Sequence, residues 1–215
     1  MKIVAAKKIL EANDRLAEEN RTRFGAAGVF CVNLVGSPGA GKTTLLEALF
    51  AELKGRLRLA VIEGDIAGSI DAERIAKLGV PVVQINTQGA CHLDAAMIAA
   101  ALADFDLDAV DVLLIENVGN LVCTAGYDLG EHLRIVVLST SEGDDKAVKY
   151  PAIFQGSQAL CITKADLLPL TNFDVPRITA DMKRLAPQSE IFQVAALTGE
   201  GIPAAADWLA GKCSP

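Results

Sequence analysis

The residues best suited to carry out chemistry lie at 36–43, which read Gly-Ser-Pro-Gly-Ala-Gly-Lys-Thr. The three glycines permit backbone conformations closed to residues with a Cβ, so several N–H groups can converge on one anion. An apolar run over 30–35 precedes the segment and a helical pattern follows from Thr43, so a helix N-terminus would face the same anion. This context predicts a phosphate-binding loop in which Lys42 reaches the β- and γ-phosphates and the Thr43 hydroxyl binds Mg²⁺.

The nucleotide would contact the whole of this loop and the start of its helix, and we therefore expect binding by Gly36, Ser37, Pro38, Gly39, Ala40, Gly41, Lys42, Thr43 and Thr44. Magnesium needs further oxygen ligands, and Asp65 and Glu116 each follow an apolar strand pattern. Either carboxylate would hold Mg²⁺ or orient the attacking water, and Asp71 is a third candidate. For Asp65, the alternative role is that of a helix N-cap.

Thr163-Lys164-Ala165-Asp166, after another apolar run, carries a possible base-recognition site. The Asp166 carboxylate can accept the N1 and N2 hydrogens of guanine, and adenine offers no matching pair, while the Lys164 stem can cover the base plane. The four residues resemble the Asn-Lys-x-Asp motif of GTPases, with threonine in place of asparagine as in signal-recognition-particle GTPases. Residues 195–199 resemble the last base-contacting loop of GTPases, which adds Ala196 and Leu197 to the expected site.

Cys91, His92 and Cys123 suggest a second kind of chemistry. Two thiolates and an imidazole suit a soft or borderline cation such as Ni²⁺ or Zn²⁺. One chain offers three ligands, one short of a closed tetrahedral site, so two chains would have to meet there to complete it. The alternative is a helix-start cysteine, a surface histidine and a loop cysteine with no metal. Cys31 and Cys161 lie in apolar strand patterns and are expected in the core.

These residues need a scaffold, and the hydrophobic pattern predicts strands alternating with helices. Such alternation indicates an α/β fold with a mostly parallel sheet of about seven strands, covered on both faces, with ligands at the carboxyl ends of the strands. We expect an amphipathic helix over 2–20 and a connector over 21–28, so that residues 1–28 precede a nucleotide-binding domain over 29–215. The expected strands cover 30–35, 57–63, 81–85, 110–115, 133–138, 159–163 and 191–194, and the expected helices cover 43–54, 70–78, 92–104, 174–185 and a last segment from about 202.

Composition limits the partners. The chain has 215 residues, of which 51% are hydrophobic, and a formal net charge of −7. An acidic surface disfavours nucleic acid, and no apolar run reaches transmembrane length, so we expect a soluble cytoplasmic protein with no membrane partner.

Together these motifs resemble the hydrogenase nickel-incorporation GTPases (the HypB family) over nearly the whole chain. The resemblance rests on Gly-Ser-Pro-Gly-Ala-Gly-Lys-Thr at 36–43, Glu-Gly-Asp-Ile at 63–66, Asp-Ala-Glu-Arg-Ile at 71–75, Gly-Ala-Cys-His-Leu at 89–93, Glu-Asn-Val-Gly-Asn-Leu-Val-Cys at 116–123, Glu-Gly-Asp-Asp-Lys at 142–146 and Asn-Phe-Asp-Val at 172–175. It implies a three-layer P-loop NTPase fold and a GTP-hydrolysing metallochaperone that helps deliver nickel to the large subunit of [NiFe]-hydrogenase.

The resemblance also implies a homodimer whose interface holds the Ni²⁺ or Zn²⁺ site of Cys91, His92 and Cys123, and a HypA-type nickel chaperone as a partner. It places Thr43, Asp65 and Glu116 at the Mg²⁺ site, with GTP as substrate. Three departures stand out: Thr124 replaces a common proline, no N-terminal cysteine motif is present, and the chain has only two histidines. Lys146 is a candidate contact for nucleotide or partner charge.

Catalysis would rest on Lys42, Asp65 and Glu116, and we expect slow intrinsic hydrolysis because no arginine finger is evident. Three other functions stay open. One is a urease-type accessory GTPase, although that family has a proline between its metal-site Cys and His. The second is a small-molecule kinase, and the third is a GTPase that binds partners without metal.

Overall fold

In the computed structural model, which describes residues 7–213, seven parallel strands form one sheet in the order β3-β2-β4-β1-β5-β6-β7. The α/β class and the parallel sheet expected from the sequence are confirmed. The strands are β1 Phe30–Gly36, β2 Leu59–Asp65, β3 Val82–Asn86, β4 Val112–Glu116, β5 Leu133–Ser139, β6 Ala159–Thr163 and β7 Glu190–Gln193.

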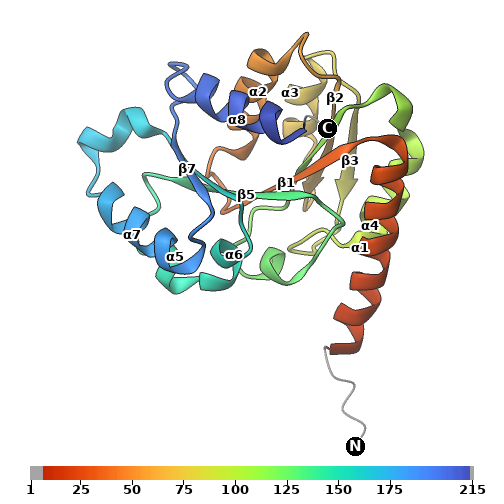
Figure 1. The fold of residues 1–215 in the computed structure, drawn as a ribbon, viewed down its shortest axis with the longest axis horizontal. Coiled ribbons are helices and arrows are strands. Elements are labelled where there is room, and N and C mark those ends of the chain that lie inside the picture. The colour runs from red at the N-terminus through yellow and green to blue at the C-terminus, as the bar shows by residue number, and fades with distance from the viewer. Residues whose placement is uncertain (1–6, 214–215) are drawn as a thin grey trace, which may run out of the picture.

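Helices cover both faces of the sheet (Figure 1), with α2, α3 and α8 on one side and α1, α4, α5, α6 and α7 on the other. Their bounds are α1 Lys7–Ala27, α2 Lys42–Leu53, α3 Ile70–Ala76, α4 Ala95–Ala101, α5 Lys146–Lys149, α6 Pro151–Gln155, α7 Val175–Leu185 and α8 Ile202–Cys213. None of the helices within residues 7–213 is long and apolar enough to cross a lipid bilayer.

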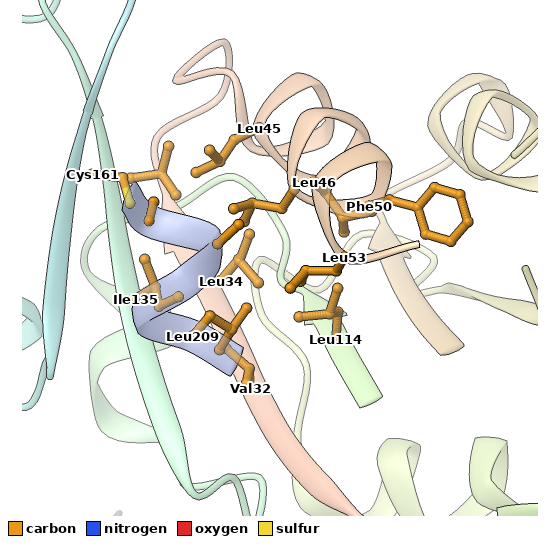
Figure 2. Close-up of a cluster of buried hydrophobic side chains, with 14 of the residues drawn as sticks. Val32, Leu34, Leu45, Leu46, Phe50, Leu53, Leu114, Ile135, Cys161 and Leu209 are labelled. Atoms are coloured by element: carbon orange, nitrogen blue, oxygen red, sulfur yellow. The ribbon is translucent and has the colours of Figure 1, made fainter. Parts of the chain in front are cut away.

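The core explains why the strand sequences are continuously apolar. A parallel strand covered on both faces buries every side chain, and successive residues point to opposite faces. In β1, Val32 and Leu34 pack under α2 and α8 (Figure 2), whereas Cys31 packs toward α1 and α4. Cys161 is also buried in this core, so both cysteines take the structural role expected for them.

Most expected boundaries lie within two residues of the observed ones, and two segments differ in kind. Residues 21–27 are helical rather than a connector, because Gly25 is accommodated inside α1 and the turn falls at Gly28, whose φ is +69°. Phe24 is fully buried, which ties this part of α1 to the sheet. The part of the expected first helix at 2–6 lies outside the described residues.

The segment carrying Cys91 and His92 is likewise a bend and not a helix start. α4 begins three residues after His92, because Asp94 accepts the Met97 N–H at 2.8 Å and is the N-cap. The short helices α5 and α6 were not expected between the fifth and sixth strands. Their sequences are too short for a helical period to stand out.

Candidate functional site

The loop between β1 and α2 lies at the carboxyl end of the central strand of the sheet. Gly39 and Gly41 have φ values of +75° and +88°, in the left-handed region that favours glycine. A Cβ at Gly36 would collide with the carbonyl oxygen of Val137 on β5, so the entry to the loop also needs glycine. The backbone therefore has the local shape of an anion-binding loop that runs into a helix N-terminus.

Lys42 and Thr43, the first residues of α2, face a buried carboxylate. The Thr43 hydroxyl donates to Glu116 Oε1 at 2.7 Å. Burial lowers the pKa of Lys42, while the charge of Glu116 acts in the opposite direction. A cation, a hydroxyl and a carboxylate thus converge beside the loop.

Glu63 is a second buried carboxylate at this site, and the sequence motifs did not identify it as a site residue. It lies beside Glu116 because the two are register partners on β2 and β4. Glu63 and Glu116 are only 3% and 4% exposed, and the Oε2 atom of each has no hydrogen-bond partner among the described residues. Burial, with the neighbouring charge of Glu116, raises the pKa of Glu63 to about 8, and burial raises the pKa of Glu116 to about 7. Glu63 lies two residues before Asp65 and therefore on the same face of β2, and this spacing is the signal in the sequence that would have identified it.

Asp65 lies at the end of β2 and does not cap a helix, since Ser69 precedes α3. Its carboxylate accepts backbone N–H groups of Ile66 at 2.6 Å and Gly68 at 3.0 Å, so it shapes its own loop. Asp71, the third acidic candidate, lies in the first turn of α3.

Arg74 is a further residue that sequence reasoning missed. Its guanidinium forms ion pairs with Glu47 at 2.6 Å and Asp71 at 3.1 Å, and it donates to the Thr44 hydroxyl at 3.2 Å. It therefore links α3 to the phosphate-loop helix.

A cavity of about 440 Å³ gathers these groups in one place. The carboxyl ends of β2 and β4 and the phosphate loop surround it, as expected for a parallel sheet. Its lining includes Pro38, Gly39, Gly41, Lys42, Thr43, Thr44, Glu63, Asp65, Asp71, Arg74, Glu116, Gly119 and Lys164.

A second cavity, of about 260 Å³, adjoins the first at Gly41, Thr44 and Lys164. It is also lined by the remaining base-site candidates, Asp166, Ala196 and Leu197. Lys164 has a φ of +55°, and its Nζ donates to Gly39 O at 2.9 Å, so its side chain runs over the phosphate loop.

The departure from the usual asparagine at Thr163 has a structural counterpart. The Thr163 hydroxyl donates to Ala40 O at 2.6 Å and so anchors the phosphate loop to β6. Thr163 lines the second cavity, but its hydroxyl is bonded to the protein's own phosphate loop.

Cys91, His92 and Cys123 lie together, with ligand atoms all within 4.8 Å of one another. The Cys91 Sγ is 2.6 Å from the Cys123 Sγ and 3.8 Å from His92 Nδ1. Burial lowers the pKa of His92, which favours the neutral imidazole that binds metals, and the His92 ring stacks on Tyr127 at 3.8 Å. Three donors suited to Ni²⁺ or Zn²⁺ thus converge within one chain.

Lys146 does not line either of these two cavities. Its Nζ is 5.6 Å from the centre of the Tyr150 ring, and both residues line a 290 Å³ cavity. Ser37 and Pro38 of the phosphate loop line the same cavity, so Lys146 lies near this loop.

Fold and loop define a P-loop nucleoside-triphosphate-binding protein, and residues 30–193 match the family described as CobW/HypB/UreG, nucleotide-binding domain. The chain is 48% identical over 201 residues to hydrogenase maturation factor HypB of Escherichia coli K12, which covers 94% of this chain and 69% of that relative. It is 45% identical to the probable hydrogenase maturation factor HypB of Methanocaldococcus jannaschii, covering 91% and 89%. The crystal structure of HypB from Helicobacter pylori in complex with nickel matches with a TM-score of 0.89, 41% identity and coverage of 94% and 95%. The chain belongs to the HypB family.

Proposed function

We propose that this chain is a GTP-hydrolysing metallochaperone that helps insert nickel into the large subunit of [NiFe]-hydrogenase. The observation that carries the proposal is that the phosphate-loop cavity and the group of Cys91, His92 and Cys123 both lie at the carboxyl ends of the strands. The printed names of the relatives from Escherichia coli and Helicobacter pylori, a hydrogenase maturation factor and a HypB in complex with nickel, support the same function.

Guanine is the proposed base. The second cavity brings Asp166 beside Lys164, Ala196 and Leu197. A carboxylate there can accept both guanine N1 and N2 hydrogens, while the Lys164 stem and the apolar side chains cover the ring. Adenine offers the Asp166 carboxylate no matching pair of donors, so it would forgo both of these hydrogen bonds.

The residues at the cavity fit Mg²⁺. Two buried carboxylate oxygens, Glu63 Oε2 and Glu116 Oε2, lack partners within residues 7–213, and the Thr43 hydroxyl points at Glu116. These are the hard oxygen ligands that Mg²⁺ prefers, and we propose that Thr43, Asp65 and Glu116 hold it directly or through water. When bound, the ion supplies charge neutralisation for the β- and γ-phosphates.

Hydrolysis then rests on positioning and charge. Lys42 is held beside the phosphate loop, where its ammonium would stabilise the charge that develops on the transferred phosphoryl group. Asp65 or Glu116 would orient the attacking water. The Arg74 guanidinium is already engaged by Glu47 and Asp71, so we propose that intrinsic turnover is slow.

Nickel or zinc is the cargo of the Cys91, His92 and Cys123 cluster. Three ligands leave a tetrahedral site open, and a second copy of the chain meeting this surface would complete it. A site shared between two chains releases its metal when the chains part, which suits transfer to a HypA-type chaperone or to the hydrogenase large subunit in the cytoplasm.

Two alternatives are weighed against this function by particular residues. A urease-type accessory GTPase would carry proline between its cysteine and histidine, whereas Cys91 and His92 are adjacent. A small-molecule kinase has no use for a guanine-reading carboxylate such as Asp166.

Nickel titration of the purified chain tests the proposal. Nickel is added with GDP and then with a non-hydrolysable GTP analogue, while molecular mass is followed, and Cys91→Ser is compared with Cys213→Ser. We expect nickel binding that needs Cys91 but not Cys213, with an affinity or mass that changes with the nucleotide. Nickel binding that is absent, or that ignores both Cys91 and the nucleotide, would refute the metal role and leave a nucleotide hydrolase.

A further inference from the structure

The loop after β4, residues 117–124, contacts both candidate sites. At its start, the buried Asn117 side chain accepts the Leu93 N–H at 3.2 Å and the Val118 N–H at 2.9 Å. Leu93 directly follows His92, so this bond ties the Cys91-His92 segment to the end of β4. Asn117 also lines the nucleotide cavity.

Asn120, in the middle of the same loop, is bonded to both sides. Its backbone N–H donates to Gly36 O at 2.9 Å, at the point where the phosphate loop leaves β1. Its side-chain Oδ1 accepts the N–H groups of Val122 at 2.7 Å and Cys123 at 2.8 Å. One residue therefore separates the phosphate loop from the backbone of a metal ligand.

Close contacts on both sides of Asn120 restrict the movement of this loop. A Cβ built on Gly119 would lie 2.8 Å from both Cα and N of Pro38, so the two loops are in close contact. On the other side, the Thr124 hydroxyl donates to Asn120 O at 2.5 Å, and Thr124 is fully buried. This hydroxyl closes the turn with a bond that a residue without a side-chain donor could not make.

We propose that Asn120 is a positioning residue that couples nucleotide occupancy of the phosphate loop to the geometry of Cys123. This inference rests on the proposed function. A phosphate group that fixes the position of residues 36–38 also fixes the Asn120 backbone, which is bonded to Gly36. The Asn120 carboxamide in turn sets the position of the Cys123 N–H. Asn120 is not itself a ligand, so its removal should cost the coupling more than the binding of either ligand.

The test compares the nickel dissociation constant with GDP and with a non-hydrolysable GTP analogue. Asn120→Ala should bring the ratio of the two constants to within about two-fold of one, whatever its value in the unmodified chain. Asn120→Asp keeps the acceptor oxygen and should retain the ratio. Asn86→Ala is the matched control. The Asn86 side chain also accepts a backbone N–H two residues later, that of Gln88 at 2.9 Å, but Asn86 has no bond to the phosphate loop among the described residues.

The outcomes separate the inference from the function on which it rests. If nickel affinity in the unmodified chain is the same with both nucleotides, the proposed coupling is refuted and Asn120 has nothing to transmit. If the unmodified chain shows coupling and Asn120→Ala keeps it, the role of Asn120 alone is overturned. Should Asn120→Ala fail to fold, Asn120→Gln displaces the same oxygen by one methylene and is expected to lose the ratio.

Discussion

At the scale of single residues, the proposed nucleotide cavity concentrates buried ionisable side chains. Lys42, Glu63 and Glu116 are each less than 10% exposed, and they come from three different elements. Removing charge from water is unfavourable unless opposite charge or hydrogen bonds compensate, and two carboxylate oxygens here have no partner among the described residues. The cavity is therefore a place where bound ligand can relieve an energetic cost that the fold maintains.

Glu63 makes this cost measurable through pH. With a pKa of about 8, raised from an ordinary 4.5, the folded chain holds a proton that the unfolded chain releases. The free energy of unfolding of the ligand-free chain should therefore fall as pH rises from 5 to 8, by at most about 1.4 kcal/mol per pH unit. In Glu63→Gln this fall should be smaller, so the variant gains stability relative to the unmodified chain toward pH 8.

Urea unfolding from pH 5 to 9, with EDTA and without nucleotide, provides the measurement. Glu190→Gln is the control, because Glu190 is exposed on β7 and its removal should leave the pH slope unchanged. An equal slope for Glu63→Gln and the unmodified chain would show that Glu63 does not carry the proton.

At the scale of elements, the loop after β4 is defined by what its backbone touches. Gly119 and Pro38 both line the first cavity and lie in close contact, so the loop after β4 and the phosphate loop together form one side of that cavity. Only glycine leaves room for that approach.

Gly119→Ala should therefore push the two loops apart. Overpacking of this kind typically costs about 1–3 kcal/mol, and we expect GDP affinity to drop by roughly ten-fold or more together with a lower free energy of unfolding. Gly126→Ala, at the other end of the loop region, meets no heavy atom within 4 Å and serves as the control. Fluorescent-nucleotide titration and urea unfolding check both quantities, and unchanged GDP affinity in Gly119→Ala would contradict the argument.

The strands and the phosphate loop could be predicted because their signals are local. An apolar run of six residues, followed by glycines at fixed spacing, leaves few alternatives. What escaped prediction depends on tertiary contacts: Glu63 is notable only beside Glu116, and Gly25 stays helical because Phe24 is buried in the core. The boundary at Asp94 was missed because the alanine-rich stretch that follows extends the helical pattern in either direction.

The three cysteine and histidine ligands were proposed from residue type, but their convergence could not be derived from spacing. Cys91 and Cys123 are 32 residues apart, and they meet because the strands that precede them, β3 and β4, both pair with β2 in the sheet. Strand order is a property of the whole chain, which a single sequence read locally does not contain.

At the scale of the whole molecule, the carboxyl end of the sheet holds both cavities and the group of Cys91, His92 and Cys123. A ligand that binds only the folded chain stabilises it by mass action. GDP at 100 times its dissociation constant should raise the free energy of unfolding by about 2.7 kcal/mol, whereas ADP at the same concentration should have little effect.

Asp166→Asn should remove this preference for GDP, since the amide presents donors where the guanine hydrogens need an acceptor. Thermal unfolding with each nucleotide is the measurement. Equal stabilisation by ADP and GDP in the unmodified chain would refute guanine recognition by Asp166.

The strand order also bears on how the protein is made. The sequence of the phosphate loop is complete at Thr44, yet its strand, β1, takes its place in the sheet by pairing with β4 and β5. Both partners lie far along the chain, with β5 ending at Ser139. During synthesis, β1 has no neighbour until β4, which ends at Glu116 of the 215 residues, has left the ribosome, and its second edge stays unpaired until β5 follows. A nascent chain that stops before Ser139 should therefore be unable to capture nucleotide and should depend on chaperones that cover apolar strands.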